Sequence, residues 1–137
     1  MFDAAEADQL RTPEQIEARV REMFKDPKAR DASSAFFNEW LRAGDLDGLS
    51  KDPATYPTYT SAVGAAMKDG LAAFTSAIVW DGDGRIDTLL TSPSLFVDGP
   101  TAGVLGIPNV SGAKLTRVEM NAERYAGILT QPAVLTV

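Results

Sequence analysis

Apolar residues recur at helical spacing near the start of the chain and predict an amphipathic helix over residues 12–25. Thr12, Pro13 and Gln15 form a typical helix start, with a capping threonine, a proline at the first helical position and a glutamine that completes a capping box. Charged residues occupy one side of this helix. The other side carries four apolar residues: Ile16, Val20, Met23 and Phe24. We expect this apolar stripe to face a core.

A second helix is predicted over residues 27–43, directly after the cap-and-proline pair at positions 26 and 27. Its apolar side carries the densest aromatic cluster of the chain, which contains Phe36, Phe37 and Trp40. We interpret Phe36 and Trp40 as core anchors, because large apolar residues at helical spacing are usually buried. The alternative is that the three rings form a platform for a ligand.

A third, longer helix is predicted over residues 58–80, and Gly64 and Gly70 within it indicate close packing against another helix. Short helical turns follow at 85–91 and 101–105, with a strand or extended strap at 94–97. Polar and apolar residues alternate over 115–121, which predicts a two-faced strand. The expected fold is therefore mainly α, a compact bundle of about three main helices with short helical turns and a strand-like C-terminal strap.

The same pattern predicts a division into an N-terminal extension (1–11), a helical domain (12–109) and a final segment (110–137) that holds the strap and the start of a next domain. Because the chain stops inside an apolar run, whereas domain ends are usually polar, we expect it to be truncated. The apolar tail either packs within its own domain or needs a neighbour. In the second case Ile128, Leu129 and Val134 would form an exposed patch.

The composition excludes several types of catalytic and metal-binding site, but it says little about the fold. The 137 residues are 45% hydrophobic, which suits a globular core, but they include neither Cys nor His. Thiolate nucleophiles, Ser-His pairs, c-type haem attachment and Cys/His zinc sites are therefore excluded within this chain. The net charge of −6 disfavours nucleic acid and anionic membrane surfaces. The most apolar stretch, Gly70–Trp80, is too short to span a membrane, so we expect no membrane span.

The most site-like string lies between positions 80 and 87 and resembles a calcium-binding loop, with Asp81, Asp83 and Asp87 as candidate metal ligands. With Gly84 at the sixth loop position, two of the main ligand positions hold apolar residues: Val79 and Leu90. The alternative is a plain turn in which Asp87 caps the next helical turn.

Two further groups of residues are candidate sites. Arg124 and Tyr125 present a cation and a phenol to a ligand in one interpretation. In the other, Arg124 anchors a loop and Tyr125 is buried with its hydroxyl hydrogen-bonded. The acidic loop residues Asp45, Asp47 and Asp52 are expected to stay solvated, because nothing in the sequence separates their pKa values for acid–base work. We expect no catalytic residue and no bound cofactor in this chain.

Six strings in register resemble a known family. They are Leu10–Pro13, Met23–Arg30, Phe36–Leu41, Asp87–Thr91 with Phe96-Val97, Gly106–Pro108, and Arg124–Gln131 with Val134–Thr136. The first five are similar to a planctomycete-type cytochrome-associated domain of unknown function, and the sixth is similar to the opening of its neighbouring domain. Asp98 stands where that family usually has Asn, and Leu105 where it has an aromatic residue.

The resemblance implies a periplasmic or extracellular location within a large exported bacterial protein, where c-type haem is bound by another part of the polypeptide. We therefore expect a noncatalytic structural or interaction module whose partners are the flanking domains of the same polypeptide. Two alternatives stay open. In one, the chain supplies part of an enzyme active site that downstream domains complete, and in the other it is a calcium-stabilised module at Asp81, Asp83 and Asp87.

Overall fold

A computed structural model describes residues 2–137, which divide between Ser33 and Ser34 into two compact units. The first unit contains α1 (Phe2–Glu6), α2 (Pro13–Met23) and the beginning of α3 (Pro27–Trp40). The predicted start of α2 is confirmed, because the Thr12 hydroxyl accepts a hydrogen bond from the Gln15 amide at 3.3 Å. The Gln15 side chain in turn accepts one from the Thr12 amide at 3.2 Å, which completes the capping box.

The apolar stripe of α2 does not face a core, so that prediction was wrong. No residue of this helix is buried, and the exposed fractions of Ile16, Val20, Met23 and Phe24 lie between 40% and 61%. Among the described residues of the first unit, Ala4 alone is buried. Helical periodicity identifies an apolar side, but it does not reveal whether the chain supplies a surface to cover that side.

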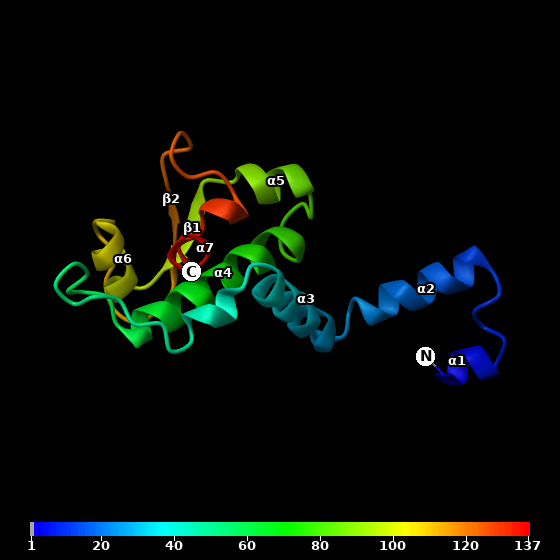
Figure 1. Cartoon of the computed structure of the whole chain (residues 1–137). Helices are drawn as coiled ribbons and strands as arrows, with labels where there is room; N and C mark the ends of the chain where they lie inside the picture. The colour runs from blue at the N-terminus through cyan, green and yellow to red at the C-terminus, as the bar shows by residue number, and fades with distance from the viewer. Residues whose placement is uncertain (1) are drawn as a thin grey trace. The chain divides into compact units, whose positions relative to one another are not determined.

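The second unit is built around one long helix, α4 (Ser61–Val79) (Figure 1). The other elements are the end of α3, η1 (Ala43–Leu46), α5 (Ile86–Thr91), β1 (Ser94–Val97), α6 (Gly99–Leu105), β2 (Thr116–Glu119), η2 (Ile128–Thr130) and α7 (Pro132–Thr136). The helix α4 contacts β1, η1, α5, α6 and α7. Strands β1 and β2 pair antiparallel, with Leu95 opposite Val118. The mainly α class is therefore confirmed, and the strand-like strap is β2.

One side of α4 forms the centre of the main hydrophobic core. Its buried residues follow the helical repeat that the sequence predicts: Val63, Gly64, Met67, Gly70, Leu71, Phe74, Thr75 and Ile78. A side chain at Gly70 would collide with the backbone carbonyl of Phe96 in β1. Close packing at this glycine is confirmed, but its partner is a strand rather than a helix. Gly64 instead lies against the hydroxyl of Tyr59.

The aromatic residues of α3 are arranged differently from the prediction. Phe37 is buried in the main core, whereas Phe36 and Trp40 are 58% and 55% exposed. The rings of Phe36 and Trp40 stack on each other with their centres 5.7 Å apart. The interpretation of Phe36 and Trp40 as core anchors was wrong, because these residues, four apart, share a side of α3 that points away from the core.

The C-terminal tail packs within the second unit. Ile128 and Ala133 belong to the main core, and the buried side-chain amide of Gln131 donates a hydrogen bond to the Ser94 carbonyl at 3.1 Å. Leu129 stays exposed, and Val134 is half-buried against the core. The tail therefore packs within its own unit. The assignment of 110–137 to a neighbouring domain stays a prediction.

By length and mean hydropathy, α4 reaches the range of a membrane-crossing helix, with 19 residues and a mean hydropathy of 1.2. Core helices of soluble proteins pass the same test, and the eight buried residues of α4 pack against protein. The apolar stretch is thus longer than the sequence pattern indicated. The absence of a membrane span stays a prediction.

Candidate functional site

Two of the three candidate metal ligands, Asp81 and Asp83, lie in the turn between α4 and α5, and the third, Asp87, lies in the first turn of α5. The Asp83 carboxylate accepts hydrogen bonds from the Arg85 amide at 3.0 Å and from the Thr88 hydroxyl at 2.7 Å. These two bonds hold the pKa of Asp83 below its ordinary value. The Asp87 carboxylate accepts hydrogen bonds from two nitrogens of the Arg85 guanidinium. These bonds lower the pKa of Asp87 and raise that of Arg85.

This arrangement is a turn held by its own side chains. Gly84 has φ of +64°, a left-handed conformation that glycine adopts without strain. The predicted capping role of Asp87 was wrong, because α5 begins at Ile86 with Arg85 as the N-cap and Asp87 lies in its first turn. Within residues 2–137 no three His, Cys, Asp or Glu side chains gather closely enough to hold a metal ion. Calcium binding at Asp81, Asp83 and Asp87 stays a prediction.

A groove of about 580 Å³ in the second unit brings together two of the strings that carried the family resemblance. Gly106, Ile107 and Pro108 follow α6 and form one wall, and Arg124 and Tyr125 belong to the turn after β2. The remaining lining comes from the end of α6, from β2 and from the residues that follow β2: Leu105, Val118, Glu119, Met120 and Asn121. The sequence singled out Arg124 and Tyr125 but gave no sign that they face residues 106–108.

The polar groups of this groove differ in how they are used. Glu119 is paired with Arg117 at 2.8 Å, and the Asn121 side-chain oxygen accepts a hydrogen bond from the Glu123 amide. The Arg124 guanidinium makes no hydrogen bond or ion pair within the described residues. The described lining contains no Ser, Thr or Lys, so its reactive side chains are the Glu119 carboxylate and the Tyr125 hydroxyl, beside the Arg124 guanidinium that can hold a ligand.

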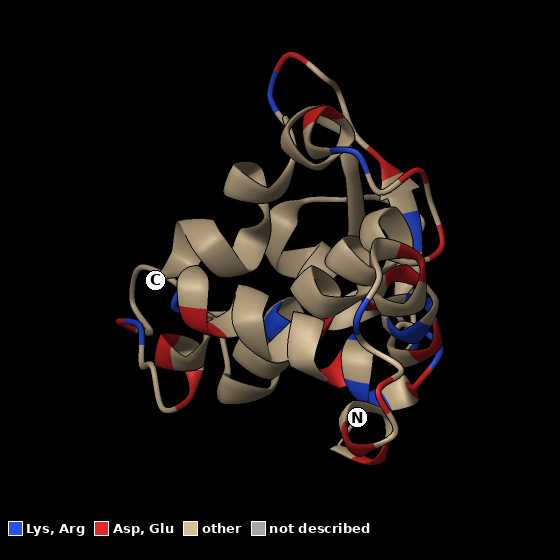
Figure 2. Cartoon of the chain, turned by 90° about the vertical axis from the view of Figure 1, so that its right-hand side faces the viewer, with Lys and Arg blue, Asp and Glu red and all other residues tan. Residues whose placement is uncertain are grey.

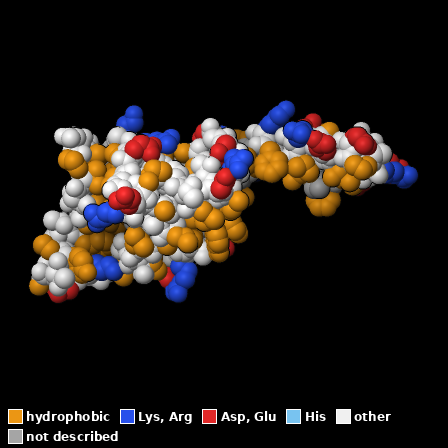
Figure 3. Space-filling view, turned by 90° about the horizontal axis from the view of Figure 1, so that it is seen from above, with side chains coloured by type: hydrophobic (Ala, Val, Ile, Leu, Met, Phe, Trp, Pro, Cys, Tyr) orange, Lys and Arg blue, Asp and Glu red, His pale blue; other side chains and the backbone are white. Residues whose placement is uncertain are grey.

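A second hollow, of about 450 Å³, lies in the first unit where α2 is followed by α3. Its lining is mostly apolar: Val20, Met23, Phe24, Ala29 and Ala32, with Asp26 and Lys28. Figure 3 shows hydrophobic side chains gathered along this part of the chain. The hollow extends the exposed apolar stripe of α2 onto α3.

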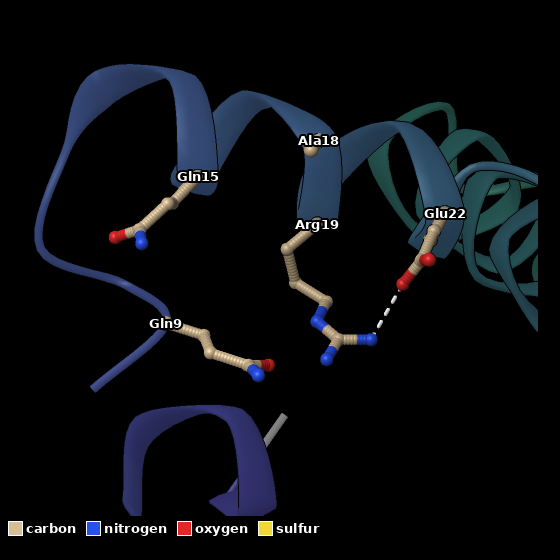
Figure 4. A pocket seen from close by; sticks show the side chains of 5 residues that line it. All are labelled: Gln9, Gln15, Ala18, Arg19 and Glu22. Carbon is tan, nitrogen blue, oxygen red and sulfur yellow. Dashed lines mark hydrogen bonds and ion pairs between the residues drawn. The ribbon is translucent and has the colours of Figure 1, made fainter. Parts of the chain in front are cut away.

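The opposite flank of α2 borders a polar hollow of about 330 Å³ (Figure 4). Gln15, Arg19 and Glu22 project from one side of the helix, and Gln9 lies across from them. Because Arg19 is already paired with Glu22, and Gln15 serves in the capping box, these groups already have partners within α2 and its cap.

Acidic and basic side chains are interspersed along the chain (Figure 2).

The acidic loop after α3 also has a structural role. Asp45 pairs with Arg42, and Asp47 pairs with Lys68 of α4. The pKa of Asp52 is lowered by hydrogen bonds from the Ala54 amide and the Thr55 hydroxyl. Each of the three carboxylates therefore has a local partner of its own, and the absence of an acid–base pair stays a prediction.

Comparison with known proteins gives a family without an assigned activity. No curated protein and no solved structure matches the chain significantly. The expected association with cytochromes and with planctomycete-type proteins therefore stays a prediction. The family model described as PSD4, a protein of unknown function (DUF1592), matches residues 1–107, and the chain belongs to this family.

Proposed function

We propose that this chain is a noncatalytic interaction module of a larger exported protein, and that it docks onto the flanking domains of the same polypeptide through α2. The observation that supports this role is the exposure of Ile16, Val20 and Met23 on a helix with no buried residue. An isolated helix of eleven residues is marginal in water, because its stability normally comes from packing of its apolar side. A flanking domain would supply that packing.

The hollow between α2 and α3 supports the same proposal. It is open and mostly apolar, and it continues the stripe beyond the end of α2. A large apolar side chain from a neighbouring domain would fit this hollow, with Asp26 and Lys28 available for polar contacts at its edge.

Hydrogen exchange is the direct test. We expect the amides of residues 16–24 to exchange rapidly in the chain alone and to be protected in a longer polypeptide that includes the flanking domains. Val20→Asp should remove the protection, since it places a carboxylate in the middle of the stripe. Ala18→Asp is the matched control, because it adds the same charge on the opposite side of α2. Equal exchange in both polypeptides would refute the proposed docking.

We further propose that the module works in the periplasm or outside the cell, in a parent protein whose c-type haem lies elsewhere in the polypeptide. The family resemblance of the six strings supports this part, and the chain itself has no Cys or His to hold haem. Cell fractionation and an absorption spectrum of the intact parent protein test it. A cytoplasmic parent without haem bands would overturn this part and leave the docking role of α2 to its own test.

A further inference from the structure

The second unit has a small hydrophobic cluster that is not closed. Its buried members are Leu95, Val97 and Ala102. Six further apolar side chains pack against these three and are only half-buried: Leu105, Ile107, Val110, Val118, Met120 and Tyr125. Five of the half-buried residues line the 580 Å³ groove, so the groove is the open side of this cluster.

The groove combines this apolar floor with one available cation. Arg124 is exposed at the edge of the lining and has no partner among the described residues, whereas the nearby Glu119 is paired with Arg117. Asn121 uses its side-chain oxygen to accept from Glu123, so its amide hydrogens remain as donors. The hydrogen bond and the ion pair from Arg117 both reach the Oε1 atom of Glu119, and Tyr125 adds a hydroxyl that can donate or accept. Arg124 is the one cation of the described lining and its strongest donor.

We propose that this groove binds a small carboxylic acid with an apolar body. A guanidinium presents paired N–H donors that match the two oxygens of a carboxylate, which makes this the acid group that Arg124 is best suited to hold. The apolar body would lie over Ile107, Val118 and Met120 and cover the open side of the cluster. The volume lies within the usual range of small-molecule sites, about 300–1,000 Å³.

The charges in the groove argue against two other ligand classes. A cationic ligand would lie near the unpaired Arg124, and the charge of Glu119, the one carboxylate of the described lining, is already offset by Arg117. A polyanion such as nucleic acid needs many cations, whereas Arg124 is the single unpaired cation of the described lining and the chain carries a net charge of −6. A monocarboxylate needs only the one guanidinium.

Titration of the full chain with 4-phenylbutyrate, followed by amide NMR, tests the proposal. We expect shifts confined to residues 105–108 and 118–125, and at least tenfold weaker binding of the neutral 4-phenylbutanamide. Arg124→Gln should weaken phenylbutyrate binding at least tenfold. Lys114→Gln, which removes the same charge from an exposed residue outside the groove, should change it less than twofold.

A second variant tests the site without removing Arg124. Pro108→Glu adds a carboxylate at an exposed position of the lining and should abolish binding of the acid. Thermal unfolding of each variant checks that the fold is retained. Equal binding of acid and amide, equal effects of the variants at 124 and 114, or shifts outside the groove would overturn the proposal. None of these outcomes bears on the docking role of α2.

Discussion

Replacing Gly70 by alanine places a methyl group against the backbone carbonyl of Phe96, where α4 packs on β1. The collision is with backbone, so it cannot be relieved by rotation of a side chain. Either β1 moves away from α4, or α4 moves within the main core. Both responses disturb contacts that hold the second unit together, and we expect the variant to be less stable than the wild type.

The size of the effect follows from two opposing contributions. Alanine is favoured over glycine inside a helix by about 1 kcal/mol. Inserting a methyl group into a well-packed core costs about 1–3 kcal/mol, and a backbone contact favours the upper part of this range. The expected net loss is about 1–2 kcal/mol in the free energy of unfolding, or a fall in Tm of roughly 3–8 °C for a chain of this length.

Thermal and urea unfolding followed by far-UV circular dichroism measures this change. Gly103→Ala is the matched control, because Gly103 lies in α6 and an added methyl group there would meet nothing within 4 Å. The control should be stabilised by up to about 1 kcal/mol. If the two variants shift Tm in the same direction and by similar amounts, close approach at Gly70 is not what requires a glycine.

Three other perturbations have defined outcomes. Gly127→Ala should lower Tm more than Gly70→Ala, because Gly127 has φ of +68° with ψ of −159° and its added methyl group would also meet backbone; an unchanged melting curve would contradict this. The pKa of Asp83 is lowered in the folded chain, so its ionised carboxylate stabilises the fold above the ordinary pKa of aspartate. This stabilisation is lost as the pH falls through the lowered pKa. Asp83→Asn removes the titrating group and should therefore flatten the fall of Tm below about pH 4. A wild-type slope in that variant would show that other groups cause the acid sensitivity. Millimolar calcium should raise Tm if Asp81, Asp83 and Asp87 hold the ion, and an unchanged Tm removes that hypothesis.

Local signals in the sequence were sufficient to predict the longer helices and the strands, but not α1, η2 or α7. The capping box at Thr12 is a contact within three residues, whereas the repeat along α4 and the alternation around Val118 follow from the geometry of a single helix or strand. All three can therefore be identified from the sequence alone. The same signals identify the apolar sides of α2 and α3.

Which apolar side is covered depends on contacts between distant segments. Ile16 and Trp40 lie on well-formed helices, yet both are exposed, because no described segment packs over them. The groove was missed for the same reason: Ile107 and Arg124 are far apart in sequence, and only the pairing of β1 with β2 brings their segments together. Periodicity carries no information about such pairings.

The position of the tail in the core has a consequence for the order of events during synthesis. Lys51 donates a hydrogen bond to the Thr136 carbonyl at 2.8 Å, and the Thr136 hydroxyl contacts the Met67 sulfur at 3.6 Å. The ribosome synthesises α4 long before α7. The buried side of α4 therefore cannot complete its packing until residues 128–136 have been synthesised. During that interval the nascent chain presents a long apolar helix to its surroundings, which is a state that chaperones recognise and that favours aggregation.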